Sequence, residues 1–145
     1  MSEPNQKELV VKKVTDFLIK REEVERAYIF GSFTSMDKYH DIDIAVYLKD
    51  GFNKYDPINH PFGYESTLIG ELISVVKKEV DFIVMNNAGL LIQHRIINKG
   101  MLLFCRNDKT RIHYENYIRK LYIDAEHIRN IQNYYLRKEY DNAGY

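Results

Sequence analysis

The sequence lacks a surplus of charge of either sign, a pair of cysteines and a long apolar run. Its 21 lysine and arginine residues are balanced by 21 aspartate and glutamate residues. The long-range attraction typical of a general nucleic-acid binder is therefore missing. The one cysteine, Cys105, has no partner for an internal disulfide. No early apolar stretch has the flanks of a signal peptide or the length of a membrane span, so we expect a soluble, cytoplasmic protein.

Two further absences simplify the expected organisation. The five histidines show no metal-ligand spacing with one another or with Cys105, which gives a zinc site little support. Repeats, low-complexity tracts and an interdomain linker are also missing. A chain of 145 residues, 45% of them apolar, can bury one core. We expect a single domain over residues 1–145, with a core at about 22–105 and a C-terminal helix at about 108–137.

The hydrophobic pattern predicts helices and strands in the order α-β-β-α-β-α-β, followed by the long C-terminal helix. Apolar residues at helical spacing favour helices over 4–20, 68–76, 87–99 and 108–137. Alternating or β-branched runs favour strands over 24–30, 41–48, 80–85 and 101–105. The fold class is α+β, with a small mixed sheet, flanking helices and one long C-terminal helix.

Several residues are expected to begin or end these helices. Pro4 is tolerated at the start of the first helix, because a proline there removes no helical hydrogen bond. Asn87 and Asp108 are expected to cap the N-termini of the last two helices. Gly100 suits the C-terminal cap of the helix that Asn87 begins.

Acidic and aliphatic side chains alternate in the strand that begins at Asp41. Since side chains of a strand alternate between its faces, Asp41 and Asp43 point to one face while Ile42 and Ile44 point to the other. Two neighbouring carboxylates repel each other unless a cation lies between them, and Mg²⁺ prefers carboxylate and phosphate oxygens. The pair therefore indicates a magnesium site.

A third carboxylate, Asp81, stands at the start of a later apolar strand and can meet Asp41 and Asp43 across the sheet. Three acids from neighbouring strands indicate a site for two metal ions about 3.5–4 Å apart. Such a site binds a triphosphate, stabilises the leaving pyrophosphate and lowers the pKa of an attacking hydroxyl. We predict that all three aspartates are metal ligands and catalytic residues, and that Asp81 orients or deprotonates the hydroxyl.

Gly31 and Ser32 close the first strand at a point where a phosphate can approach the backbone. Glycine has no side chain to obstruct that approach, and serine offers a hydroxyl beside free amides. We therefore predict that Gly31 and Ser32 contact the triphosphate.

Each of these features also has an ordinary structural interpretation. An Asp-x-Asp pattern alone is typical of the polar face of a half-buried strand. Gly31 and Ser32 can end a strand for conformational reasons, and Asp81 can hydrogen-bond a nearby turn. Only the ordered set of all three motifs favours a catalytic site.

This ordered set, Gly31-Ser32, Asp41-Ile42-Asp43 and Val80-Asp81-Phe82, resembles the minimal nucleotidyltransferases of the DNA polymerase β-like superfamily. Over nearly the whole chain the sequence is similar to the MntA antitoxin subfamily, with further matches at Asn86, Gly100, Tyr122, Asp124 and Arg129.

The resemblance implies the antitoxin of a HEPN/MNT toxin–antitoxin pair. Members of this subfamily are magnesium-dependent protein adenylyltransferases, which move AMP from ATP to a tyrosine of their HEPN ribonuclease toxin. The expected cofactor is Mg²⁺, as two ions, the expected substrate is ATP, and the expected partner is a HEPN toxin. We expect no membrane and no direct nucleic-acid contact.

The sequence departs from the family in the loop between Ser32 and Asp41. The eight residues from Phe33 to His40 are fewer than the family usually has, and they lack its usual Arg-Gly pair. This difference leaves open an antitoxin that is catalytically idle and blocks its toxin by contact alone. A second alternative is transfer to a small molecule such as an aminoglycoside.

Tyrosines of the C-terminal helix also allow two interpretations. They are spread around the helix rather than confined to one stripe, so some of them must be exposed. They serve either in packing or in a partner surface, since tyrosine is enriched at interfaces. These residues are Tyr114, Tyr117, Tyr122, Tyr134 and Tyr135.

Overall fold

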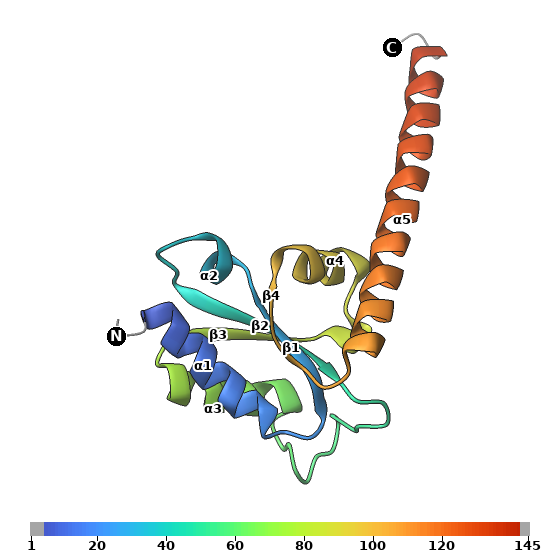
Figure 1. Cartoon of the computed structure of the whole chain (residues 1–145). Coiled ribbons are helices and arrows are strands. Elements are labelled where there is room, and N and C mark those ends of the chain that lie inside the picture. Colours follow the sequence, from blue (N-terminus) through green and yellow to red (C-terminus); the bar gives the residue numbers. More distant parts are fainter. Residues whose placement is uncertain (1–4, 143–145) are drawn as a thin grey trace.

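The computed structural model describes residues 5–142, which form a four-stranded mixed sheet with helices on both faces (Figure 1). The strand order is β3-β2-β1-β4, with β2 parallel to β3 and antiparallel to β1. The elements in chain order are α1 (Gln6–Ile19), β1 (Val24–Phe30), α2 (Ser32–Ser35), β2 (Asp41–Leu48), α3 (Tyr64–Val76), β3 (Glu79–Val84), η1 (Met85–Asn87), α4 (Leu90–Lys99), β4 (Met101–Cys105) and α5 (Asp108–Asn142). The predicted α+β class and the long C-terminal helix are confirmed.

The first helix begins close to where the sequence predicts it, at Gln6. Asn5 caps α1, and its side chain accepts a hydrogen bond from the Glu8 N–H at 2.8 Å. Pro4, which we expected near the start of this helix, lies outside the described residues, as do residues 1–3 and 143–145 of the predicted domain.

The prediction that Asn87 caps α4 was wrong. Asn87 ends the short helix η1, and α4 begins at Leu90 with Gly89 as its N-cap. The polar side chain that matters here is the preceding Asn86, which exchanges two 2.8 Å hydrogen bonds with the backbone of Leu48. Because Asn86 ties this turn to the end of β2, helix α4 starts later than the pattern predicts.

Two further boundaries differ from prediction at the C-terminal helix. Asn107, rather than Asp108, caps α5, since its side chain accepts a hydrogen bond from the Thr110 N–H at 3.1 Å. The helix also continues to Asn142, beyond the predicted end at about Arg137. Among the described helices, none is long and apolar enough to span a membrane.

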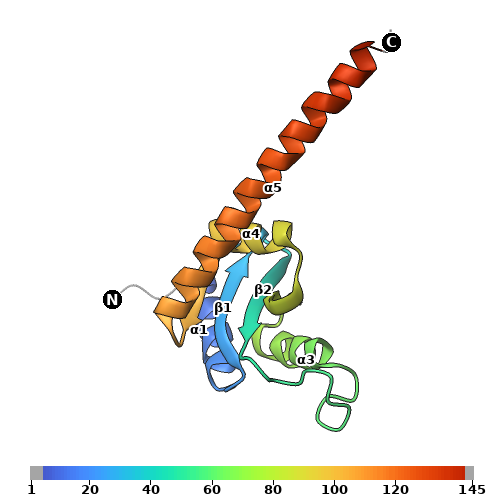
Figure 2. The ribbon, with the colours of Figure 1, turned by 90° about the vertical axis from the view of Figure 1, so that its right-hand side faces the viewer.

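The helices cover the two faces of the sheet separately. Helices α1 and α3 pack on one face, where Ile42 and Ile44 of β2 are fully buried. Each such isoleucine contributes about 1.5–3 kcal/mol on burial. Helix α4 and the beginning of α5 cover the other face, where Tyr28 and Ala45 are buried (Figure 2). Gly100 ends α4 as predicted.

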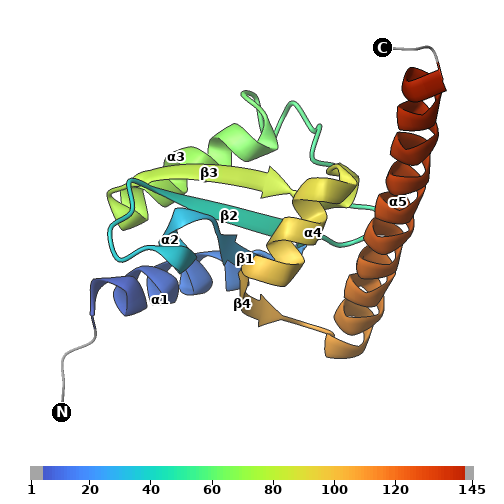
Figure 3. The ribbon, with the colours of Figure 1, turned by 90° about the horizontal axis from the view of Figure 1, so that it is seen from above.

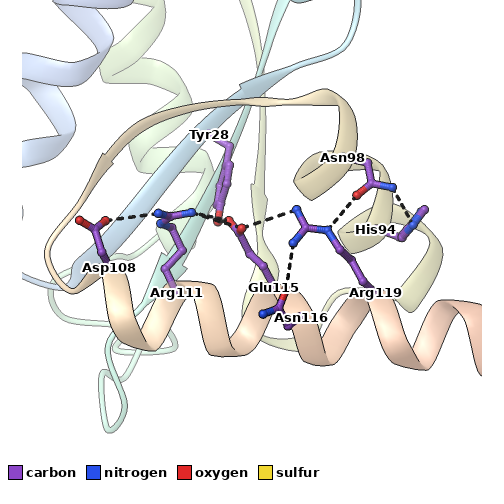
Figure 4. A network of polar contacts seen from close by, with 8 residues as sticks. All are labelled: Tyr28, His94, Asn98, Asp108, Arg111, Glu115, Asn116 and Arg119. Carbon is purple, nitrogen blue, oxygen red and sulfur yellow. Dashed lines mark hydrogen bonds and ion pairs between the residues drawn. The ribbon is translucent and has the colours of Figure 1, made fainter.

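One buried carboxylate, Glu115, attaches α5 to the sheet. It is only 7% exposed, and it accepts a 2.6 Å hydrogen bond from the hydroxyl of Tyr28 (Figure 4). Arg111, one turn earlier on α5, approaches the same carboxylate at 3.2 Å, and Arg119 lies 3.7 Å from it. Burial and the neighbouring Glu115 raise the pKa of Tyr28, so the phenol stays a donor at neutral pH.

Beyond this attachment, α5 projects away from the body of the protein (Figure 1). The apolar residues at helical spacing over 108–137 are covered only in the first part of the helix, where Ile118 is 4% exposed. Further along, Ile128 and Tyr135 are 55% and 63% exposed. The periodicity correctly predicts a helix, but the apolar side chains in its second half are largely exposed in the described structure.

Replacing the buried acid tests this attachment. We expect Glu115→Ala to lower the free energy of unfolding by about 2–3 kcal/mol, because Tyr28 and Arg111 would each lose a charged partner. The matched control is Asp108→Ala, which removes the other acid bonded to Arg111, at a side chain that is 73% exposed. That change should cost under about 1 kcal/mol. Urea unfolding measures both, and equal losses would contradict the buried network.

Candidate metal centre

The structure brings together the three aspartates that the sequence singles out. In the parallel pairing of β2 with β3, Asp43 lies directly opposite Asp81, and Asp41 stands two residues earlier on the same face. One carboxylate oxygen of each aspartate lies within 4.8 Å of the others. Among the described residues 5–142, no other group of three or more acidic, histidine or cysteine side chains has this arrangement. That these aspartates bind metal is still a prediction.

The electrostatics of this cluster are those of a site that needs a cation. Burial, the charge of Asp41 and the hydrogen bond and charge of Asp81 together raise the pKa of Asp43 to about 6. Its ordinary value is 3.8. The donor set consists of carboxylate oxygens only, and a hard divalent cation such as Mg²⁺ is the ion that this chemistry suits. The residues present therefore fit a magnesium site.

Two features of the structure explain why position 31, beside this cluster, is a glycine. Its φ is +75°, in the left-handed region that favours glycine. A Cβ atom at this position would lie 2.0 Å from Oδ2 of Asp43, closer than any real contact. The register of β1 and β2 explains this proximity, since Phe30 pairs with Asp43. The sequence predicts a glycine turn here, but its contact with Asp43 follows only from the strand pairing.

Ser32 begins α2 immediately after this turn and is partly exposed. The turn is fastened by side chains of α2, because the hydroxyl of Thr34 donates to the carbonyl of Gly31 at 2.9 Å. Ser35 donates to the same carbonyl at 3.3 Å. Gly31 thus lies beside Asp43, with Ser32 next to it in the chain, while the contact of both with a triphosphate stays a prediction.

The short loop after the turn is anchored rather than loose. Phe33 is 3% exposed, and the ring of Tyr39 packs against it with 4.6 Å between centroids. From α1, the ammonium group of Lys7 donates to the carbonyl of Phe33 at 2.7 Å and also to that of Met36. The two ends of this loop are therefore held together, and the shorter length is compatible with an ordered site. His40, just before Asp41, is exposed.

The sequence model of a family described as "Polymerase beta, Nucleotidyltransferase" matches residues 12–109. This range includes the sheet, Gly31 and all three aspartates. A search of curated proteins finds no match.

Solved structures with the same fold come from toxin–antitoxin complexes. One matching chain comes from the complex of a tri-AMPylated Shewanella oneidensis HEPN toxin with an MNT antitoxin, with a TM-score of 0.66, 20% identity, and coverage of 86% of this chain and 92% of that one. Another, from a toxin–antitoxin complex with AMP-PNP, gives a TM-score of 0.66 and 19% identity over 83% of this chain and 92% of that one. A third, from the MntA–HepT complex, gives a TM-score of 0.63 and 20% identity over 84% and 92%. These likenesses establish the fold.

A methyl group on Gly31 tests the geometry of the cluster. We expect Gly31→Ala to weaken Mg²⁺ binding by about 10-fold or more, because the new Cβ must displace the carboxylate of Asp43. The matched control is Gly51→Ala, since Gly51 also has a positive φ, +82°, but a Cβ there meets nothing within 4 Å. Both variants should lose about 1–3 kcal/mol of stability from backbone strain. Calorimetric titration with Mg²⁺ separates the two, and equal metal affinity in both variants would refute the predicted role of Gly31.

The raised pKa of Asp43 predicts how stability depends on pH without metal. A carboxyl whose pKa is raised by folding favours its protonated form, so its contribution is fully present below about pH 3.8 and is lost as pH rises through about 6. We therefore expect the melting temperature of Asp43→Asn, relative to that of the parent, to rise as the pH increases from about 4 to 7 when EDTA is present, and to level off above this range. The exposed acid Asp124 offers a control, because the melting temperature of Asp124→Asn relative to the parent should not change across this pH range. A flat difference for Asp43→Asn as well would show that the three carboxylates do not interact.

Proposed function

The chain belongs to the polymerase beta nucleotidyltransferase family, and we propose that it is an antitoxin that transfers AMP from ATP to a tyrosine of a HEPN-domain toxin. The observation that carries this proposal is the meeting of Asp41, Asp43 and Asp81 on one face of the sheet, beside the Gly31 turn. A cluster of carboxylates next to a glycine turn provides both elements that the transfer of a nucleoside monophosphate needs, a place for metal and a place for phosphates.

Each residue has a distinct task in this proposal. Asp41 and Asp43 hold the metal, and Asp43 owes its position to Gly31 and to its pairing with Asp81. When bound, Mg²⁺ supplies charge stabilisation for the triphosphate and lowers the pKa of the attacking hydroxyl. Asp81 is the most exposed of the three, and in this proposal it accepts the proton of that hydroxyl.

The proposed reaction balances as a single displacement. The tyrosine oxygen of the acceptor forms a bond to the α-phosphorus of ATP, and the bond between that phosphorus and the bridging oxygen of the β-phosphate breaks. Pyrophosphate leaves with that oxygen, and the phenolic proton moves to the carboxylate of Asp81. The product is a tyrosine that carries AMP through its oxygen.

Two observations favour a protein as the acceptor. One solved structure of the same fold holds a tri-AMPylated HEPN toxin with an MNT antitoxin, and another holds AMP-PNP. Within the described residues, α5 carries a row of exposed apolar side chains far from the sheet, which a monomeric protein seldom leaves uncovered. They include Ile123, Ile128, Ile131, Tyr134, Tyr135 and Leu136. A protein acceptor would explain both features.

Incubation with ATP, Mg²⁺ and a HEPN-domain protein as the candidate toxin tests the proposal. We expect the toxin to gain the mass of AMP, and Asp41→Ala combined with Asp43→Ala to reduce the rate by at least about 100-fold. A control that removes two acids outside the site, Glu22→Ala with Asp50→Ala, should retain the parent rate, since both side chains are exposed.

The contrary outcomes are distinct. An unmodified toxin that is still neutralised by the double-aspartate variant would establish an idle antitoxin that acts by contact. Modification of an aminoglycoside by the protein alone, with the toxin unchanged, would establish the small-molecule alternative.

A further inference from the structure

A second set of side chains lies around the Gly31 turn. A cavity of about 410 Å³ lies between α2 and α4, and its lining comprises Gly31, Thr34, Ser35, Arg95 and Lys99. The end of α4 reaches this point because it abuts β1, as a Cβ on Gly100 would lie 3.3 Å from the carbonyl oxygen of Ile29. Figure 3 shows α4 beside α2 along the same edge of the molecule.

Arg95 and Lys99 have no counter-charge of their own. They stand one turn apart on α4, and the side chain of neither forms a hydrogen bond or ion pair with another residue of the described range 5–142. The residues that line the cavity include no acid that could neutralise these cations. Two uncompensated cations in one cavity indicate an anionic ligand.

The other side-chain hydrogen-bond donors of the cavity already have an acceptor, so Arg95 and Lys99 are the side chains available to bind an anion. The hydroxyls of Thr34 and Ser35 already donate to the carbonyl of Gly31, as does the Thr34 N–H at 3.1 Å. The carboxylate of Asp43 also approaches this glycine, since its Oδ2 would lie 2.0 Å from a Cβ at Gly31. Gly31 therefore borders both the acidic cluster and the cavity that holds the two cations.

We propose that Arg95 and Lys99 bind the β- and γ-phosphates of ATP and hold the pyrophosphate as it leaves. This inference rests on the proposed function and extends it to residues of α4. A guanidinium group can bind phosphate oxygens with two parallel hydrogen bonds, and an ammonium group adds a compact charge. Cations fixed beside the leaving group stabilise the charge that develops there in the transition state.

Binding measurements on α4 variants test the inference. In the presence of Mg²⁺, we expect Arg95→Ala and Lys99→Ala each to weaken ATP binding by about 10-fold, and the double variant by about 50- to 100-fold. Inorganic pyrophosphate should show the same losses. Binding of AMP, which has neither phosphate, should change by less than about 3-fold. Arg95→Lys should recover part of the loss, because it restores the charge without the fork of two donors.

The matched control also removes two positive charges, but from α5, where Lys109 and Lys120 are exposed. Lys109→Ala with Lys120→Ala should leave the affinity for ATP and pyrophosphate within about 2-fold at the same ionic strength. The side chains of Arg95 and Lys99 are exposed, so we expect the fold to survive their removal. Measured melting temperatures test whether each variant is folded.

Three results would overturn the inference: no binding of ATP or pyrophosphate by the parent, parent-like affinity of the folded double variant for both, or equal losses for ATP and AMP. Loss of toxin binding with unchanged ATP affinity would also overturn it and would assign the cations to the partner. Failure of the proposed function gives a different signature, in which the parent binds ATP through these cations yet transfers no AMP to the toxin.

Discussion

The pairing of β2 with strands on both of its sides is the constraint on which this structure depends. Its antiparallel register with β1 places Phe30, and hence Gly31, beside Asp43. Its parallel register with β3 places Asp81 opposite Asp43. A slip of one residue in either ladder would turn the aspartates of β2 toward the core formed with α1 and α3. The register that buries the isoleucines of β2 is therefore the same register that assembles the acidic cluster.

The same strand also explains how the fold tolerates three carboxylates close together. Repulsion between two charges about 4 Å apart in water costs about 1 kcal/mol and rises where water is partly excluded. Ile42 and Ile44, which alternate with Asp41 and Asp43, are fully buried on the opposite face. Their burial contributes about 1.5–3 kcal/mol each, so the strand stays in register even without a metal ion. The cluster is thus prepared before any cation binds.

Much of this arrangement could be predicted from the sequence, because it depends on local alternation. The period of two residues along β2 predicts both the strand and the shared face of its aspartates, and Asp81 follows from its place at the start of the next strand. Features that depend on tertiary contacts could not be predicted. The pattern gives no sign that Asn86 would fasten η1 to β2, or that Gly31 would touch Asp43. Glu115 is a charge within an apolar surface, the opposite of what periodicity predicts.

Helix α4 connects the acidic cluster of Asp41, Asp43 and Asp81 with the projecting helix α5. Figures 1 and 3 both place α4 between α2, next to the acidic cluster, and the projecting helix α5. Helix α4 packs against α5 at one place and lines the cavity beside Gly31 with α2 at another. On the proposed function, a partner bound along α5 would extend its acceptor tyrosine past α4 toward the phosphates. The cations of α4 lie on that route, and for this reason the measurements of ATP affinity and toxin binding have to be made on the same variants.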